Sequence, residues 1–297
     1  MAINSGLREQ QVQADSELVV IFLTFNSSAV IDRTIRAAQK ITGNIICVDS
    51  YSTDETRSIA AELGCQVLER PFKHYADQRN WAIETVGNSS RWQLHLDADE
   101  MLDDAAVQQI LQALTSAGET EGFMLRRKTY FMQRALHFGG TMSWHLRLFR
   151  SGRARCESRL YDQHFICDGP TKRLNRGWLH DLNGGTLAEW VNRHNRWSDL
   201  ESSEVLQTFG EENGGQLKPD LLGDPRQRTR YYKGIYYRMP LLLRATLYFF
   251  YRYFLRGGFL DGRTGFIYAV LQALWFRILV DAKILEAREH KVDTYTV

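Results

Sequence analysis

Hydrophobic runs alternate with amphipathic segments in the first part of the chain. Runs rich in β-branched residues predict buried parallel strands, and they cover residues 18–24, 44–48, 65–68 and 92–96. Helical patterns lie between them, at residues 29–40, 54–63 and 76–86. This alternation favours βαβ units, a parallel sheet, and a nucleotide-sized ligand at the carboxyl ends of the strands.

The pattern changes after about residue 120. Residues 123–131 and 143–149 have the pattern of strands joined by loops that contain glycine, and residues 187–207 predict a helix. Residues 210–225 are rich in Gly, Pro and acidic residues, which is typical of a linker. From Arg226 onward the chain is helical, aromatic and basic.

These changes of pattern predict four parts. They are a flexible arm at residues 1–16, an α/β domain at 17–209, the linker at 210–225 and a helical region at 226–297. Within the α/β domain, the pattern divides the chain into halves at about residues 17–120 and 121–209.

Composition excludes several classes of protein. Hydrophobic residues make up 44% of the chain and charged residues 24%, which argues against global disorder. The four cysteines have no zinc-like or CxxC spacing, so we expect them to be reduced. The polar N-terminus predicts no secretory signal, and no run of about 18 uncharged apolar residues predicts a conventional spanning helix. We therefore expect a cytoplasmic protein.

Two carboxylates directly follow the strand at residues 92–96. Asp97 and Asp99 are separated by one residue and leave the strand end toward the expected ligand crevice. Their hard oxygens suit Mg²⁺ or Mn²⁺, and such an ion usually shares its coordination shell with substrate phosphates. The alternative is an acidic, solvated turn.

Polar residues also end the first two strands. Asp49 can accept a hydrogen bond from a base N–H or a ribose hydroxyl, although it can equally be a turn-forming residue. Thr24 and Asn26 end the first strand, where an ordinary strand-to-helix turn is the alternative. Asp54 is expected to cap the following helix.

These segments, in this order, resemble family-2 glycosyltransferases with the GT-A fold. The likeness covers roughly residues 18–150 and is carried by LTFNSS, VDSYSTDET, RPFKHYADQRNWAIE and LHLDADE. The later segment GGFLDGRTGF is similar to the bacterial lipopolysaccharide-core and polysaccharide glucosyltransferase branch. The resemblance implies a Rossmann-like mixed sheet, with residues 17–120 as donor half and 121–209 as acceptor half.

The resemblance also implies roles for single residues at the nucleoside. The position of Asp49 contacts uracil in members of the family. Thr24 and Asn26 occupy the loop that lies along the nucleoside.

Further roles concern the diphosphate. Asp97 matches the carboxylate near the ribose and the metal shell, and Asp99 matches the direct ligand of Mn²⁺ or Mg²⁺. Arg79 and Asn80 match a pair on the helix that faces the donor, where Arg79 can reach a phosphate through two hydrogen bonds. A surface arginine is the alternative for Arg79.

The catalytic base is less well specified by the sequence. An inverting transferase needs a group that deprotonates the acceptor hydroxyl, and the glutamate of the family falls on Gln163, which cannot act as a base. Asp162 is the first candidate and His164 the second, with a plain loop carboxylate as the alternative for Asp162. His180 can complete a metal or phosphate shell, or be a structural histidine.

A basic and aromatic segment follows the linker. Residues 225–260 contain eight Lys or Arg and no acidic residue, and seven of the thirteen tyrosines lie between Tyr231 and Tyr253. Apolar positions recur at helical spacing, which favours contact with an anionic membrane surface. Helices packed on the catalytic domain are the alternative, and no nucleic-acid-binding module is evident.

The leading hypothesis is therefore an inverting glycosyltransferase. It would move a hexose from a UDP-sugar to a lipid-linked saccharide in cell-surface polysaccharide or lipopolysaccharide synthesis, peripheral to the cytoplasmic face of the membrane. One alternative is a nucleotidyltransferase of similar fold, although residues 18–31 contain no Gly-rich phosphate loop. Another is a non-catalytic binding protein on a degenerate scaffold, which Gln163 keeps open.

Overall fold

The computed structural model describes residues 14, 16–183, 185–208 and 217–293. The chain divides into two compact units. The first consists of residues 1–130, 143–158 and 163–184, and the second of residues 131–142, 159–162 and 185–297. Most of the predicted arm and residues 210–216 of the predicted linker lie outside the described residues.

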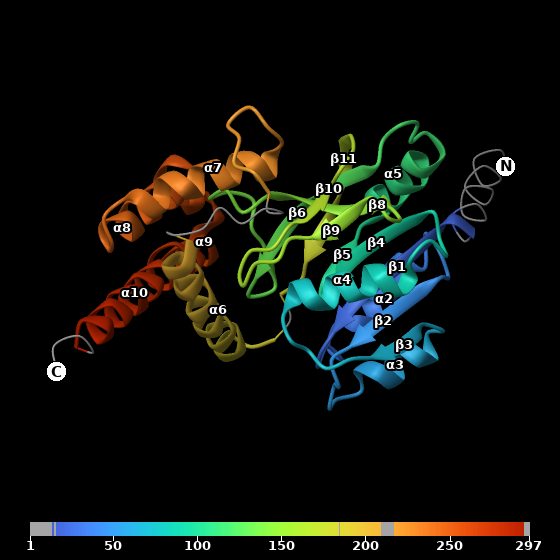
Figure 1. Ribbon diagram of the computed structural model, residues 1–297, viewed down its shortest axis with the longest axis horizontal. Helices are drawn as coiled ribbons and strands as arrows, with labels where there is room; N and C mark the ends of the chain where they lie inside the picture. The colour runs from blue at the N-terminus through green and yellow to red at the C-terminus, as the bar shows by residue number, and fades with distance from the viewer. Residues whose placement is uncertain (1–13, 15, 184, 209–216, 294–297) are drawn as a thin grey trace. The chain divides into compact units, whose positions relative to one another are not determined.

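Four parallel strands form one half of the sheet in the first unit (Figure 1). They are β1 (Leu18–Thr24), β2 (Ile45–Asp49), β3 (Gln66–Glu69) and β4 (Trp92–Asp97). Each lies within two residues of its predicted bounds. The order β3-β2-β1-β4 places β1 at the centre of this half, where it pairs in parallel with β2 and β4.

The other half of the sheet contains antiparallel pairs. Its strands are β5 (Glu100–Leu102), β6 (Gly122–Phe131), β8 (Ser143–Arg150) and β11 (Thr171–Asp181). The order continues β4-β8-β6-β11-β5, with β8 antiparallel to both β4 and β6. The sheet is therefore mixed, as the resemblance implied. A separate hairpin pairs β9 (Ala154–Cys156) with β10 (Phe165–Cys167).

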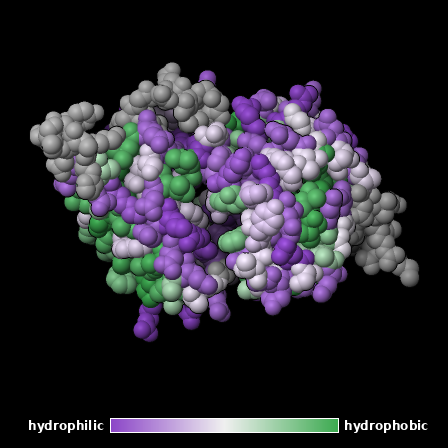
Figure 2. Space-filling model, turned by 60° about the horizontal axis from the view of Figure 1, so that its bottom comes forward, coloured by the Kyte–Doolittle hydropathy of each residue, from purple (hydrophilic) through white to green (hydrophobic). Residues whose placement is uncertain are grey.

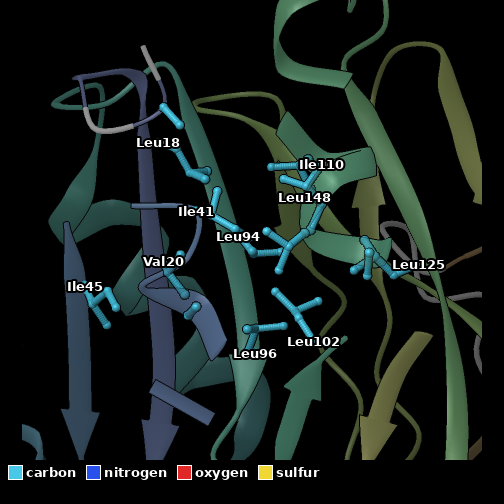
Figure 3. Packing of buried hydrophobic residues seen from close by; sticks show 14 of the residues in the cluster. Leu18, Val20, Ile41, Ile45, Leu94, Leu96, Leu102, Ile110, Leu125 and Leu148 are labelled. Atoms are coloured by element: carbon cyan, nitrogen blue, oxygen red, sulfur yellow. The ribbon is translucent and has the colours of Figure 1, made fainter. Parts of the chain in front are cut away.

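Alternate residues of β1 are buried on opposite faces of the sheet. Leu18, Val20 and Phe22 belong to the large core cluster, of which Figure 3 labels Leu18 and Val20. Val19 and Ile21 pack with Ala82 and Val86. Burial on both faces explains why this strand is a continuous hydrophobic run.

Helices of the first unit supply the rest of these cores. They are α2 (Ile31–Ala38), α3 (Thr56–Glu62), α4 (Tyr75–Val86) and α5 (Asp104–Thr115). Residues of α2 and α5 join the large cluster, and residues of α4 join the cluster on the other face. The helix α5 was not among the predicted elements; its side-chain cap, Asp103, accepts from the Ala106 N–H at 2.8 Å.

The second unit is mainly helical. Its α-helices are α6 (Leu187–Thr208), α7 (Pro225–Arg238), α8 (Leu243–Phe250), α9 (Gly262–Tyr268) and α10 (Phe276–Asp293). It also contains β7 (Arg134–Ala135) and three short turns of other helix types, at Tyr251–Leu255, Gly258–Asp261 and Ala269–Trp275.

The structure groups α6 with the C-terminal helices, whereas the sequence-based division placed residues 187–207 with the α/β domain. The reason is a shared apolar core, in which Val205 of α6 is buried with Phe276, Val280 and Ile284 of α10. The helix α7 starts where a capping box joins Asp224 to Gln227, with Pro225 at its first position.

One stretch of the second unit differs from the sequence-based expectation. Residues 258–289 are long and apolar enough, by length and composition, to cross a membrane, and a third of the apolar window is buried. Its charged residues Arg277 and Asp281 interrupt the apolar run. They pair with Glu201 of α6 and Arg244 of α8, and Asp281 is fully buried. These partners fit a helix packed among other helices better than an isolated span.

Candidate active site

Three predicted site residues lie at one edge of the sheet. Thr24 is the register partner of Asp49 across β1 and β2, and Leu23 is the partner of Asp97 across β1 and β4. Because the strands are parallel, their carboxyl ends meet there, which is where ligands bind in open α/β sheets.

The carboxylate of Asp49 is fully buried. It accepts hydrogen bonds from the Thr24 hydroxyl at 2.8 Å, from the Ser52 N–H at 2.7 Å and from the Ser52 hydroxyl at 2.6 Å. In this arrangement Asp49 fixes the loop after β2. A uracil N3–H would have to displace one of these donors, so its predicted contact with the base stays a prediction.

The loop after β1 is joined to the loop after β2. Asn26 has a positive φ of 45°. Its N–H donates to the Ser52 hydroxyl at 2.9 Å, and its side-chain oxygen accepts from the Thr53 N–H at 2.8 Å. Asp54 accepts from the N–H groups of Ser28 and Thr56, at 3.0 Å each. These hydrogen bonds join the two loops at the carboxyl ends of β1 and β2.

Two arginines hold the carboxylate of Asp97. Arg79 of α4 pairs with Oδ1, and Arg147 of β8 approaches Oδ2 at 2.8 Å. Both arginines are buried, whereas the Asp97 side chain is about one-third exposed. The predicted residues Arg79 and Asp97 are therefore in direct contact, and the exposed part of the carboxylate faces solvent.

Burial and charge act in opposite directions on Asp97. Burial alone would raise the pKa, but the guanidinium groups of Arg79 and Arg147 outweigh it and hold the pKa of Asp97 at about 2. Two residues earlier on β4, burial lowers the pKa of His95 well under its ordinary value, and the same two arginines add to that shift. Near pH 7 the site therefore contains an ionised Asp97 and a neutral His95.

A second carboxylate shares Arg147. The Glu100 carboxylate accepts from Arg147 at 2.5 Å and from the Asp97 N–H at 3.0 Å, and the residue is buried. Burial raises the pKa of Glu100, with Arg147 opposing and Asp97 reinforcing the shift. Next to this group, Arg127 of β6 pairs with Asp181 of β11 at 3.4 Å.

Four residues of this ion-pair group were not predicted from the sequence: Arg147, Glu100, Arg127 and Asp181. The sequence does carry a signal for Arg147, which stands between Leu146 and Leu148 in the buried part of β8. A charge in such a position needs a buried partner. No comparable signal indicates which carboxylate that partner is, because the pairing depends on tertiary structure.

Asp99 lies in the turn between β4 and β5 and is half-buried. Its carbonyl oxygen accepts from the Leu182 N–H at 2.9 Å, which fixes the turn. Among the described residues no group of three or more His, Cys, Asp or Glu forms a ready-made metal cage. Two neighbouring carboxylates nevertheless fit an Mg²⁺ or Mn²⁺ ion that takes its remaining ligands from substrate phosphates and water.

Asn80 uses its amide to attach α4 to β9. Its side-chain N–H donates to the Cys156 carbonyl at 3.0 Å, and its side-chain oxygen accepts from the Cys156 N–H at 2.8 Å. The structure therefore gives Asn80 a role in positioning Arg79, the preceding residue on α4. Direct contact of Asn80 with the donor stays a prediction.

The two candidate bases belong to different units. His164 is in the first unit, where its N–H donates to the buried carboxylate of Glu157 at 2.8 Å. Asp162 is in the second unit, has a positive φ of 56°, and pairs with Lys233 of α7 at 2.6 Å. A base at Asp162 would have to share its carboxylate with this lysine.

Both ring nitrogens of His180 have neighbours within the first unit. Nδ1 lies 3.0 Å from the Tyr130 hydroxyl, and Nε2 lies 3.5 Å from the Asp103 carboxylate. Burial lowers the pKa of His180, although Asp103 opposes the shift. These contacts favour a structural histidine over a metal ligand.

Comparison with known proteins gives one family. The family model for glycosyl transferase family 2 matches residues 19–182. A lipopolysaccharide core biosynthesis glycosyltransferase of Rhizobium meliloti is 25% identical over 274 residues, which cover 86% of this chain and 90% of that protein. An uncharacterized glycosyltransferase of Rickettsia prowazekii is 34% identical over 118 residues, 40% of each chain.

Solved structures are more distant. Glucosyl-3-phosphoglycerate synthase from Mycobacterium tuberculosis, in complex with Mn²⁺ and UDP-glucose, is 16% identical with a TM-score of 0.33. The match covers 42% of this chain and 47% of that chain. The same enzyme with Mg²⁺ and UDP is 15% identical, also with a TM-score of 0.33, and covers 42% and 48%.

Proposed function

The chain belongs to glycosyl transferase family 2 and is a glycosyltransferase of GT-A fold, and we propose that it moves a hexose from a UDP-sugar to a lipid-linked saccharide with inversion. The relative from Rhizobium meliloti, which is named for lipopolysaccharide core biosynthesis, supports a cell-surface saccharide as acceptor.

One observation carries the proposal about the donor. At the carboxyl end of β4, Asp97 is held ionised by two buried arginines and the next turn presents Asp99. A paired, oriented carboxylate can accept a hydrogen bond from a ribose hydroxyl without first being ordered by the ligand. The joined loops after β1 and β2 lie at the same sheet edge, where a nucleoside would bind.

Asp99, with Asp97, would hold the divalent cation. When bound, such an ion neutralises the charge that develops on the leaving diphosphate. Arg79 is placed to add a positive charge beside it, because its guanidinium, like that of Arg147, already contacts Asp97. Asp97 and Arg79 together would then orient the ribose and the phosphates, and Asn80 would keep α4 in place.

Inversion requires a base on the acceptor side. We keep Asp162 as the first candidate and His164 as the second, since each is a group that can take a proton from a hydroxyl. The pairing of Asp162 with Lys233 and the contact of His164 with Glu157 give each a fixed position within its own unit.

We also propose that the second unit binds the cytoplasmic face of the membrane. Its described residues include exposed large apolar side chains on α7, α8 and the turns that follow. Figure 2 shows one face of the molecule, on which hydrophobic and hydrophilic residues lie side by side. Leu255 is 80% exposed, and Arg238 and Arg256 are exposed in the same segment. Basic and apolar groups together fit an anionic lipid surface.

The test is an assay for released UDP with purified protein. UDP-, GDP- and ADP-linked sugars are compared with Mn²⁺, with Mg²⁺ and with excess EDTA, in the presence of membrane lipid extract as acceptor. We expect turnover with a UDP-sugar, dependence on the metal, and a product of inverted anomeric configuration by NMR. Turnover only with another nucleotide, or with retained configuration, would overturn the donor or the stereochemical part. No turnover with any donor would favour the non-catalytic alternative.

A further inference from the structure

A cluster of cations and tryptophans lies in the first unit, on the strands β6, β8 and β11. Arg126 and Lys128 are two residues apart on β6, so their side chains point to the same face of the sheet. The Arg126 guanidinium lies 4.0 Å from the centroid of the Trp178 ring, and the Lys128 ammonium lies 4.3 Å from it. One indole therefore contacts two positive charges.

Neither cation is neutralised in the described part of the chain. Arg127, which lies between them, pairs with Asp181, but no carboxylate lies within ion-pair distance of Arg126 or Lys128 among the described residues. The Nε of Arg126 is buried without a hydrogen-bond partner. Like charges placed next to each other on a sheet repel, and a half-buried cation without a counterion is costly. This arrangement suits an anion from a ligand.

A bulge in β11 places the indole there. The register between β6 and β11 shifts between Leu174 and Leu179. Within this bulge Gly177 has a φ of 72°, and its carbonyl accepts from Arg126 at 3.3 Å. The strand geometry thus fixes both the ring and one of the cations.

A second tryptophan extends the cluster. Trp144 of β8 is the direct cross-strand neighbour of Arg126. The guanidinium of Arg173, which is exposed on β11, lies 5.6 Å from the Trp144 ring. Flat aromatic rings beside hydrogen-bond donors suit the apolar face of a sugar ring, since indoles offer a rigid apolar surface.

The strand β11 connects the cluster to the turn that contains Asp99, the predicted metal ligand. Two residues after Trp178, His180 contacts Asp103 and Tyr130. Two residues further, the Leu182 N–H bonds to the Asp99 carbonyl. A saccharide bound at Trp178 would therefore lie on the strand that ends beside the donor site.

We propose that Arg126, Lys128 and Trp178 form a subsite for an anionic substituent, a phosphate or a carboxylate, on the acceptor saccharide. The inference rests on the proposed transfer to a saccharide and narrows that acceptor to an acidic one. A membrane surface is less well matched, because Arg126, Lys128 and Trp178 are all half-buried.

The experiment measures binding of three probes to the full chain by ligand-detected NMR titration: glucose 6-phosphate, glucuronate and glucose. The double variant Arg126→Gln/Lys128→Gln is compared with the matched double variant Lys172→Gln/Arg176→Gln. The matched variant removes two exposed charges from β11 without touching Trp178. Circular dichroism and UDP binding serve as checks of the fold and of the donor site.

We expect the wild type and the matched variant to bind both acidic probes at least about tenfold more tightly than glucose, and the double variant to lose this preference. Preference for phosphate alone or carboxylate alone would identify the substituent. Equal binding of all three probes by the wild type, or unchanged preference in the double variant, would overturn the subsite.

Two further readouts separate this inference from others. If the double variant loses binding to anionic vesicles but keeps its preference for acidic sugars, the cluster is a membrane contact and the subsite is refuted. Failure of the proposed transferase reaction would show as absent UDP release in the wild type. The binding preference would still be measurable in that case, so the two failures are distinguishable.

Discussion

Asp97 has two tasks that separate in experiment. Its carboxylate forms ion pairs with the buried guanidinium groups of Arg79 and Arg147, and it is placed to face the donor. The first task concerns stability and the second concerns catalysis. Asp99 is predicted to act as the direct metal ligand, so the two carboxylates of one motif should respond differently to the same substitution.

For Asp97→Asn we expect a loss of stability of about 2 kcal/mol at pH 7, because the buried Arg79 loses its charged partner and Arg147 keeps only Glu100. The folded pKa of about 2 lies below the ordinary 3.8, so the carboxylate stabilises the fold above pH 4 and loses this effect as the pH falls toward 2. Urea unfolding at pH 7, 5 and 3 should show the difference between wild type and variant shrinking.

The matched control for that series is Asp104→Asn. Asp104 is exposed and pairs with the exposed Lys40 at 2.6 Å, so its loss should change stability little at any pH. A difference for Asp97→Asn that is the same at pH 7 and pH 3 would contradict the assignment of the ion pairs.

For Asp99→Asn we expect the fold to persist and turnover with a UDP-sugar and Mn²⁺ to fall by about 10²-fold or more, because an amide is a weaker ligand for a hard cation. Thermal unfolding should change little. The measurement is UDP release across an Mn²⁺ titration, with Asp104→Asn again as control. Full activity of the wild type in excess EDTA would remove the metal role altogether.

At the scale of elements, the bulge in β11 depends on one glycine. A Cβ added to Gly177 would lie 2.0 Å from the Ala106 nitrogen and 2.5 Å from the Asp103 carboxylate, at a φ of 72°. The first turn of α5 is therefore packed directly on the bulge. The same contact holds Asp103, the cap of α5, beside His180.

Gly177→Ala should lower stability by about 3 kcal/mol or more, because both the clash with backbone and the positive φ oppose a side chain. Gly43→Ala is the control, since nothing lies within 4 Å of a Cβ there and its φ is not in the left-handed region. Chemical unfolding of both variants tests this expectation. An equal, small effect of the two substitutions would mean that the bulge can rearrange.

Sequence patterns predicted the strands β1, β2 and β4 well because all three are buried on both faces. They also placed Thr24, Asp49 and Asp97 at the strand ends, and the structure brings these ends together. The short strand β5 was not predicted, since three residues carry no periodicity. The packing of α6 against α10 was not predicted, because the apolar stripe of α6 does not indicate which element covers it.

Several ion pairs of the site join residues that are far apart in the sequence, which explains why they could not be predicted from it. Arg147 meets Asp97 and Glu100 across about 50 positions of sequence, and Lys233 meets Asp162 across 71. Local spacing carries no information on such pairs. The choice of catalytic base was affected most, because Asp162 and His164 are two positions apart in sequence and yet belong to different units.

At the scale of the whole molecule, the second unit uses its charges in two ways. Arg244 of the basic segment 225–260 forms a buried ion pair with Asp281, and Arg277 of α10 forms one with Glu201. Other basic residues of the segment 225–260, including Arg228, Arg238 and Arg256, are exposed at the surface. Only this second set is available to an anionic surface, so the eight basic residues counted from the sequence overstate the electrostatic part of binding.

The apolar part of membrane binding should then dominate. Phe254 and Leu255 are 51% and 80% exposed on the turn after α8, and inserting both side chains should contribute about 2 kcal/mol or more that salt does not screen. Each exposed arginine adds about 1 kcal/mol near an anionic leaflet at low salt. Binding should therefore be strong to anionic vesicles, weak to neutral ones, and only partly released by salt.

The double variant Phe254→Gln/Leu255→Gln should weaken binding to anionic vesicles by about tenfold or more, at low and at high salt alike, because it removes the unscreened part. Leu221→Gln/Leu222→Gln is the matched control, since these leucines are 44% and 94% exposed but precede the basic segment. Co-sedimentation with vesicles at two salt concentrations measures the binding of both variants.

Equal loss of binding in the two double variants would make the contact nonspecific. Equal recovery of the wild type with neutral and anionic lipid would refute the electrostatic part of binding. No binding of the wild type to either lipid would remove the membrane role of this unit.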